Sequence, residues 1–304
     1  MKEIKQTAIV GMGALGLLFG NQIAETIGAD KVYFVADDAR VKRYEGTKFT
    51  INGEEKNFII KSRNDATPVD LVIVATKYNH LREAIDIIKK CVSKDTIIIS
   101  ILNGISSEES IAVRYGWDKV VHCVAQGMDA VKVGGDLTYM KPGELRIGKA
   151  RAEQEENLKA VINFFEKAKV PYTFDEDILY RMWGKFMLNV GINQTCMVYE
   201  TTYQGAIEGE EAFKTMTEAM QEAMAVGDAE GIHLTKQDID DYVALIKTLN
   251  PDAMPSMRQD GMAQRPSEVE MFAGKIIELG KKHQIDVPTN EWLYKRIKEM
   301  EAKY

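Results

Sequence analysis

Short apolar runs alternate with stretches of helical periodicity through the first half of the chain. The runs are rich in Val, Ile and Leu, as in buried strands, and they cover residues 7–10, 32–36, 58–61, 71–76, 96–102 and 119–124. Helical spacing of apolar residues occupies 14–27 and 80–91. Such alternation predicts β-α-β units, and therefore a mostly parallel sheet flanked by helices.

The pattern changes twice further along the chain. Residues 131–147 hold short β runs broken by Gly134-Gly135 and Pro142-Gly143, which predicts antiparallel hairpins appended to the sheet, before a helix at 153–167 and a strand at 170–174. Only helical patterns follow, at 177–191, 208–231, 235–249, 268–282 and 291–303. We therefore expect an α/β fold of the Rossmann type over residues 1–175 and an all-helical domain over 176–304.

Length and charge narrow the class of protein. A chain of 304 residues with 45% hydrophobic residues is long enough for two cores. The formal charge of −7, from 39 basic and 46 acidic residues, argues against non-specific binding of nucleic acid. Any anionic ligand must therefore be held by local groups.

Metal, disulfide and membrane chemistry are not indicated. Three cysteines, Cys91, Cys123 and Cys196, lie far apart, and the four histidines show no ligand spacing, so we expect neither structural zinc nor disulfides. The first residues lead directly into a strand pattern, and the apolar runs stay far below the ~18–20 residues of a membrane helix. A reducing cytoplasm is the expected location.

A glycine-rich segment follows the first predicted strand. It matches GxGxxG, opens a helix, and consists of Gly11, Met12, Gly13, Ala14, Leu15 and Gly16. In the dinucleotide fingerprint, the first glycine permits a tight turn, the second admits a pyrophosphate and the third lets helix and strand pack closely. The segment therefore predicts dinucleotide binding, with a merely structural glycine turn as the alternative.

The end of the second predicted strand bears on which dinucleotide binds. Asp37 stands where an acid would bind a ribose 2′-hydroxyl, as in NAD sites, whereas Arg40, Lys42 and Arg43 follow at once. A 2′-phosphate favours planar bidentate donors, which arginine supplies. We favour NADP with Arg40 as the phosphate contact and keep NAD as the alternative. In a third interpretation, Asp37 and Asp38 only cap the following helix and the basic residues are solvated.

A polar ladder interrupts an otherwise apolar helical segment between Trp183 and Asn193. Lys185, Asn189 and Asn193 are four residues apart and share one helical face. Burying such groups without partners costs roughly 2–7 kcal/mol per neutral polar group, so a polar ligand is expected to meet them. A small anionic substrate is one candidate; solvent or neighbouring helices are the alternative.

Two further polar residues follow predicted strands. Lys77 comes after the run 71–76, and Asn103 comes after the run 96–102. Ligands of open α/β sheets bind at the carboxyl ends of strands, which raises both above ordinary loop residues.

Taken together, these residues resemble the ketopantoate reductase (2-dehydropantoate 2-reductase) family along essentially the whole chain. The resemblance rests on the order and spacing of 11–16, Thr76-Lys77, Asn103-Gly104, Lys185-x3-Asn189-x3-Asn193 after Trp183, Ser256-Met257-Arg258-Gln259-Asp260, and Arg265-Pro266-Ser267-Glu268-Val269-Glu270. It implies a two-domain, NADPH-dependent enzyme that reduces the 2-keto acid ketopantoate to (R)-pantoate in pantothenate and coenzyme A biosynthesis.

The resemblance also implies roles for individual residues. Lys185 would be the catalytic acid, and Asn189, Asn193 and Ser256 would bind substrate. Lys77 and Asn103 would line the cofactor crevice, with Asn103 also reaching substrate, and Glu268 would serve catalysis at the nicotinamide-ribose end. From the residues alone, Ser256 could equally cap a turn, and Glu268 could be an acid favoured by a helix N-terminus.

One departure keeps other functions open. Where the family often continues its substrate helix with Pro-Leu-Thr-Ala, this chain has Gln194-Thr195-Cys196-Met197. The alternatives are an NAD(P)-dependent D-2-hydroxyacid dehydrogenase for another branched or aromatic 2-keto acid, and a non-catalytic NAD(P)-binding sensor or scaffold. Met216, Met220 and Met224 are spaced as core or subunit packing residues, so a homodimer is compatible with the sequence.

Overall fold

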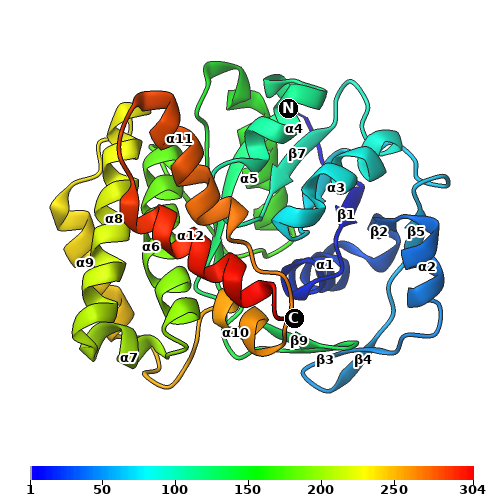
Figure 1. The fold of residues 1–304 in the computed structure, drawn as a ribbon. Helices are drawn as coiled ribbons and strands as arrows, with labels where there is room; N and C mark the ends of the chain where they lie inside the picture. Colours follow the sequence, from blue (N-terminus) through cyan, green and yellow to red (C-terminus); the bar gives the residue numbers. More distant parts are fainter. Residues whose placement is uncertain (1) are drawn as a thin grey trace. The chain divides into compact units, whose positions relative to one another are not determined.

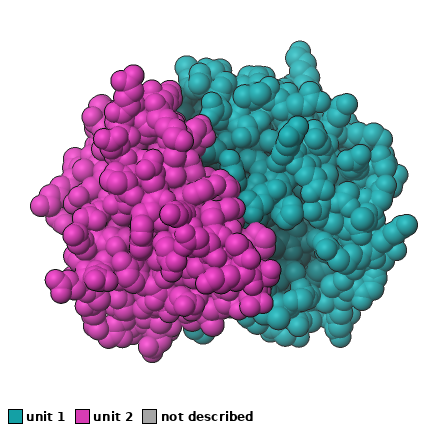
Figure 2. Space-filling model, viewed as in Figure 1, with its two compact units in different colours: residues 1–178 teal, residues 179–304 magenta. Residues whose placement is uncertain are grey.

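The computed structural model describes residues 2–304, which form two compact units. The first unit ends at Ile178 and the second is Leu179–Tyr304, coloured teal and magenta in Figure 2. The expected boundary, near residue 175, lies close to this division. We describe each unit by itself.

An eight-stranded sheet forms the centre of the first unit (Figure 1). Its strands lie in the order β12-β11-β8-β7-β6-β1-β2-β5. In that order they span Tyr172–Phe174, Glu144–Gly148, Val120–Gln126, Ile97–Ser100, Leu71–Val74, Thr7–Val10, Val32–Ala36 and Ile60–Ser62. The strands from β8 to β5 pair in parallel, whereas β11 runs antiparallel to β8.

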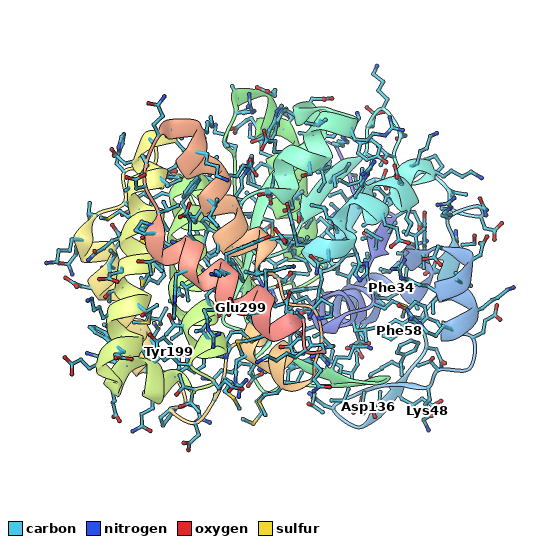
Figure 3. All side chains as sticks on the ribbon, viewed as in Figure 1. Phe34, Lys48, Phe58, Asp136, Tyr199 and Glu299 are labelled. Atoms are coloured by element: carbon cyan, nitrogen blue, oxygen red, sulfur yellow. The ribbon has the colours of Figure 1, made fainter. Side chains whose placement is uncertain are left out.

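The helices of the first unit cover both faces of this sheet. They are α1 (Ala14–Ile27), α2 (Asp38–Tyr44), α3 (Leu81–Ile87), α4 (Ser107–Tyr115) and α5 (Glu155–Lys167). Alternate residues of β1 enter different cores: Ile9 belongs to the cluster with α1 and α5, and Ala8 to the cluster with α3 and α4. A strand buried on both faces explains the unbroken apolar runs. Phe34 and Phe58 meet edge to face in the first cluster, 5.3 Å between centroids (Figure 3).

A second, four-stranded sheet in this unit corrects one expectation. Residues 131–147 were expected to form hairpins on the main sheet, but only β11 joins it. The other two strands of this region, β9 and β10, join β3 and β4 in the second sheet, in the order β4-β3-β10-β9. In that order they span Glu54–Lys56, Phe49–Ile51, Asp136–Thr138 and Val131–Val133. Because Leu137 is fully buried in the main apolar cluster together with Ile51, the hairpin of β9 and β10 pairs with β3 instead.

The second unit is helical, and no strand occurs among residues 179–304. The first helix, α6, begins at Ile178, the last residue of the first unit. The helices are α6 (Ile178–Val198), α7 (Tyr203–Glu208), α8 (Glu210–Ala229), α9 (Lys236–Lys247), α10 (Ser256–Met262), α11 (Lys275–His283) and α12 (Pro288–Glu301). A π-helical turn at Glu270–Gly274 precedes α11. Two short helices, α7 and α10, were not expected. The helix expected at 177–191 continues to Val198.

Helix α6 is the buried centre of the second unit. A Cβ at Gly184 would lie 2.5 Å from the Tyr242 hydroxyl of α9, and one at Gly191 would lie 2.5 Å from Cγ of Met220 in α8. These glycines therefore let two helices approach α6 closely. Met216 and Met220 are fully buried, which confirms their interpretation as core packing residues, whereas Met224 is half-buried.

Candidate active site

The glycine-rich loop between β1 and α1 has the geometry that a pyrophosphate needs. Gly11 has φ +107°, and a Cβ there would lie 2.5 Å from the carbonyl oxygen of Ala75. A Cβ at Gly16 would lie 2.0 Å from the Gly11 carbonyl oxygen, so the turn requires glycine at both positions. Gly13, by contrast, is exposed, and a Cβ there would come no closer than 3.8 Å to another atom, the carbonyl oxygen of Ala75. No side chain caps the N-terminus of α1. The loop thus leaves room above the first amides of α1.

Two other predicted residues follow strands at the same edge of the sheet. The Ala75 amide donates to the Val10 carbonyl (2.8 Å), and the Ile101 amide donates to that of Val74 (2.9 Å), so the ends of β1, β6 and β7 are neighbours. Lys77 is exposed and Asn103 is half-buried in the loops that follow β6 and β7. The structure therefore brings both onto the edge that carries the glycine-rich loop.

The buried hydroxyl of Thr76 also lies at this edge. Its Oγ1 has no hydrogen-bonding partner among the described residues. A buried hydroxyl without a partner is unfavourable by about 1–3 kcal/mol, which a ligand would relieve. The glycine cradle, the uncapped helix and Thr76 together fit a dinucleotide.

The guanidinium of Arg40 donates hydrogen bonds to two carboxylates, those of Asp37 and Glu83. Asp37 caps α2 by accepting from the Arg40 amide at 2.8 Å, which confirms that it is a cap. Its other oxygen accepts from the Arg40 guanidinium, so the accompanying interpretation of Arg40 as a solvated residue is wrong. Glu83 of α3 accepts from both Nη1 and Nη2, at 2.7 and 2.8 Å. The sequence analysis did not find Glu83, because nothing local links it to a residue 43 positions earlier.

The three residues of the polar ladder share one face of α6. Lys185 is half-buried, whereas Asn189 and Asn193 are 9% and 5% exposed. Aromatic rings hold the helix around Lys185, since Trp183 meets Phe186 edge to face with centroids 5.6 Å apart. The ladder thus combines a half-buried lysine with two buried asparagines on one helical face.

The π-helical turn packs directly on α6. The ring of Phe272 lies 6.4 Å from that of Phe186, and the Ala273 amide donates to Oε1 of Gln194 at 3.1 Å. Glu268, which is buried, stands just before this turn. Its carbonyl accepts from the amides of the first turn, so its position is set by the backbone.

Ser256 is exposed at the start of α10. Pro255 occupies the capping position and no side chain caps this helix, so the capping interpretation of Ser256 is wrong. Its role in binding substrate stays a prediction.

Glu108 is a buried acid that the sequence analysis missed. It lies in the first turn of α4, five residues after Asn103, and is 3% exposed. Burial raises the pKa of its carboxyl to about 7, although the Ser107 hydroxyl donates to it at 2.9 Å. No pattern of the sequence marks it, because the first turn of a helix commonly carries exposed acids.

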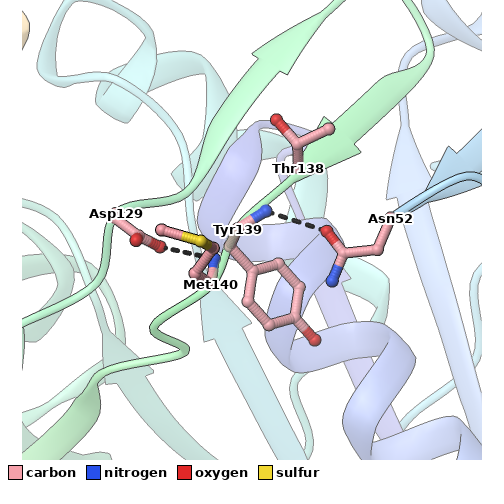
Figure 4. A pocket seen from close by; sticks show the side chains of 5 residues that line it. All are labelled: Asn52, Asp129, Thr138, Tyr139 and Met140. Carbon is pink, nitrogen blue, oxygen red and sulfur yellow. Dashed lines mark hydrogen bonds between the residues drawn. The ribbon is translucent and has the colours of Figure 1, made fainter.

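A shallow pocket in the first unit is lined by Asn52, Asp129, Thr138, Tyr139 and Met140 (Figure 4). Two of its side-chain oxygens hold backbone amides: Oδ1 of Asn52 accepts from the Tyr139 amide, and Oδ1 of Asp129 accepts from the Met140 amide, each at 2.9 Å. These bonds hold the small sheet and its loops, and the pocket contains none of the predicted site residues.

A glycine-rich loop on a parallel sheet and a polar ladder on a buried helix define a class of protein: oxidoreductases with a Rossmann-type unit and a helical unit. The family description "Ketopantoate reductase PanE/ApbA" matches residues 7–152, and "Ketopantoate reductase PanE/ApbA C terminal" matches residues 177–301. The chain belongs to the ketopantoate reductase family, as its sequence motifs suggest.

Individual relatives are distant but similar over their whole length. The 2-dehydropantoate 2-reductase of Streptococcus pyogenes serotype M6 is 25% identical over 285 residues, 92% of each chain. A D-mandelate dehydrogenase solved with NADH is 22% identical with a TM-score of 0.88, over 98% of this chain and 99% of that one. A dimeric ketopantoate reductase from Staphylococcus aureus is 21% identical with a TM-score of 0.82, over the same shares. The two structures show the shared fold.

Membrane-spanning helices, metal clusters and disulfides are absent from residues 2–304. These residues hold no helix of the length and apolarity that crossing a membrane takes, and no cluster of three or more His, Cys, Asp or Glu side chains arranged for a metal ion. Cys91, Cys123 and Cys196 are buried and unlinked.

Proposed function

We propose that the protein reduces the keto group of ketopantoate, yielding (R)-pantoate, with a reduced nicotinamide dinucleotide as the hydride donor. The family membership of both units supports this activity. The observation that carries it is the ladder of Lys185, Asn189 and Asn193 on the central helix of the second unit.

Lys185 is the proton donor in this proposal. Reduction of a ketone leaves negative charge growing on its oxygen, which a positioned ammonium stabilises and then protonates. The half-buried position suits this task, because the ammonium is shielded by the surrounding helix yet can regain its proton from solvent.

Asn189 and Asn193 position the substrate. Their amides donate to substrate oxygens and hold the keto group in one orientation, which lowers the entropic part of the barrier. Ser256, exposed at the start of α10, donates to the substrate carboxylate, and Glu268 orients the reacting groups at the nicotinamide-ribose end.

The first unit binds the dinucleotide in this proposal. The bound nicotinamide supplies the hydride from its C4. Gly11, Gly13 and Gly16 shape the loop that receives the pyrophosphate, with the amides of residues 12, 14 and 15 around it, and Lys77 and Asn103 line the crevice. The preference of the sequence analysis for NADPH stays a prediction, and it requires a 2′-phosphate to compete with Glu83 for Arg40.

A second candidate is an NAD-linked D-2-hydroxyacid dehydrogenase acting on a branched or aromatic 2-keto acid. The likeness to the D-mandelate dehydrogenase solved with NADH favours it, as does Asp37 at the end of β2. The chemistry of Lys185 would be unchanged, and only the pocket for the substrate side chain would differ.

A homodimer and a cytoplasmic location complete the proposal. The dimeric Staphylococcus aureus relative supports the first, and three buried, unlinked cysteines fit the reducing compartment of the second. Neither is needed for the chemistry.

A steady-state screen of coenzyme oxidation tests the function. Ketopantoate, 2-ketoisovalerate and phenylglyoxylate are each assayed with NADH and with NADPH. We expect the highest kcat/KM with ketopantoate. A higher value with phenylglyoxylate would favour the dehydrogenase, and no oxidation with any of the three would contradict both enzymes.

A further inference from the structure

The guanidinium of Arg40 is held from two sides, by side chains of two different helices. Nη1 and Nη2 donate to the two oxygens of Glu83 in a bidentate pair at 2.7 and 2.8 Å. Nη1 also donates to Asp37, whose carboxylate is anchored by the amide of Arg40 at 2.8 Å. Arg40 and Asp37 are only 27% and 22% exposed in their side chains, so this cluster is partly shielded from solvent.

The cluster carries one positive and two negative charges. The hydrogen bonds that Arg40 donates to Glu83, the largest cause, and to Asp37 raise the pKa of Arg40, and the bonds that Glu83 accepts from Arg40 lower the pKa of Glu83. Nδ1 of His80 lies 3.8 Å from the Glu83 carboxylate. Further along α2, the guanidinium of Arg43 lies over the ring of Tyr44, 5.4 Å from its centroid. The guanidinium of Arg40 and the carboxylates of Asp37 and Glu83 together carry a net negative charge.

This cluster stands at the end of β2, where a Rossmann-type unit meets the adenosine ribose. Carboxylate oxygens there accept from ribose hydroxyls, but they repel a 2′-phosphate of about −2 charge. To bind that phosphate, Arg40 must first release the bidentate Glu83, the geometry in which a guanidinium binds carboxylates best.

We propose that Glu83 is a specificity-determining residue which, by holding Arg40 with Asp37, makes the protein select NAD(H) over NADP(H). The inference rests on the proposed dinucleotide site but not on the identity of the keto acid. It reverses the NADPH preference expected from Arg40 alone. Glu83 is a positioning residue, because it acts through Arg40 on the cofactor.

Binding of the oxidised cofactors, measured by calorimetry without substrate, tests the proposal. We expect the wild type to bind NAD⁺ at least tenfold more tightly than NADP⁺. Glu83→Gln keeps the shape and removes the charge, so we expect NADP⁺ to bind about tenfold more tightly, about 1.4 kcal/mol, with NAD⁺ changed less than twofold. Glu83→Asp keeps the charge and should not gain affinity for NADP⁺.

Two controls separate this role from a general effect of charge or of folding. Glu299→Gln removes a similarly exposed carboxylate, labelled in Figure 3, that pairs with Arg296 at 2.7 Å in α12, and it should leave both affinities unchanged. In the double variant Glu83→Gln/Arg40→Ala, the gain for NADP⁺ should disappear, since the gain depends on Arg40.

The outcomes distinguish this inference from the proposed function. A wild type that prefers NADP⁺, or a Glu83→Gln variant whose NADP⁺ to NAD⁺ affinity ratio is unchanged, would overturn the role of Glu83. A higher kcat/KM for ketopantoate with NADPH than with NADH would leave the proposed activity standing and remove this inference. The expected affinity ratios without turnover of any keto acid would support Glu83 and remove the proposed substrate.

Discussion

The two units expose functional groups in different ways. In the sheet unit the glycine-rich loop would, in the proposed function, act through its backbone: Gly11 and Gly16 shape it, and the side chains between them are not required to donate. In the helical unit the groups are side chains on α6, where Lys185 and the buried Asn189 and Asn193 share one face. In the proposed function, one unit works through the path of its chain, and the other through the identity of three residues.

This difference teaches what substitutions should do in each unit. A backbone site is sensitive to added volume and indifferent to most other changes, whereas a side-chain site loses its chemistry when one group is removed. We therefore expect the largest functional losses from truncation in α6 and smaller, purely binding losses in the loop of residues 11–16.

Removing the ammonium of Lys185 is the most severe test of the comparison. In Lys185→Ala we expect kcat for keto-acid reduction to fall by about two powers of ten or more, a typical share for general acid catalysis. Affinity for the dinucleotide should change less than about twofold, because the loop proposed to bind it lies in the other unit. Steady-state kinetics and calorimetry measure the two quantities separately.

A matched control is Lys247→Ala, an exposed lysine at the end of α9. It should retain the activity of the wild type. If Lys185→Ala turned over as fast as this control, the helical unit would not supply the proton, and the proposed division of labour would be wrong.

Local pattern was enough to predict most of the elements that carry the site. β1, α1 and β2 have the bounds expected from the sequence, because a buried parallel strand is a continuous apolar run and the glycines mark where it turns. The spacing of Lys185, Asn189 and Asn193 likewise sufficed to place them on one helical face, since that depends only on the helical repeat.

Contacts between distant segments were not predictable in this way. The hairpin of β3 and β4 turns at Asn52-Gly53, both with positive φ, but its flanking runs are only three residues long, and Glu54–Lys56 is wholly polar. The pairing of Arg40 with Glu83 depends on how α2 and α3 pack beside the sheet. Such features follow from tertiary structure, which periodicity does not record.

The variant Glu108→Gln tests whether the buried carboxyl of Glu108 in the sheet unit affects stability rather than the reaction. Burial raises the pKa of its carboxyl to about 7 from 4.5. The folded protein thus keeps a proton that the unfolded chain has lost above pH 4.5, so the free energy of unfolding falls as pH rises from 4.5 to 7. We expect Glu108→Gln to be more stable than the wild type at pH 8, by up to about 3 kcal/mol, and to lose this pH dependence.

Denaturant unfolding at pH 5 and pH 8 measures that change. The exposed neighbour Glu109 provides the control, since Glu109→Gln should keep the pH dependence of the wild type. A loss of kcat in Glu108→Gln at unchanged dinucleotide affinity would instead give the sheet unit a side-chain role in the reaction, which would break the contrast between the units.

Gly13 offers the finest test of recognition by the backbone. Its φ of −77° suits alanine, and the nearest atom to an added Cβ would be 3.8 Å away, so Gly13→Ala should fold with unchanged stability. The methyl group would nevertheless occupy the space through which a pyrophosphate approaches, and we expect the affinities for NAD⁺ and NADP⁺ to fall together by about tenfold. Gly46→Ala, where a Cβ meets nothing within 4 Å, is the control and should change neither affinity. Unchanged cofactor binding in Gly13→Ala would mean that the pyrophosphate does not approach the loop at this residue.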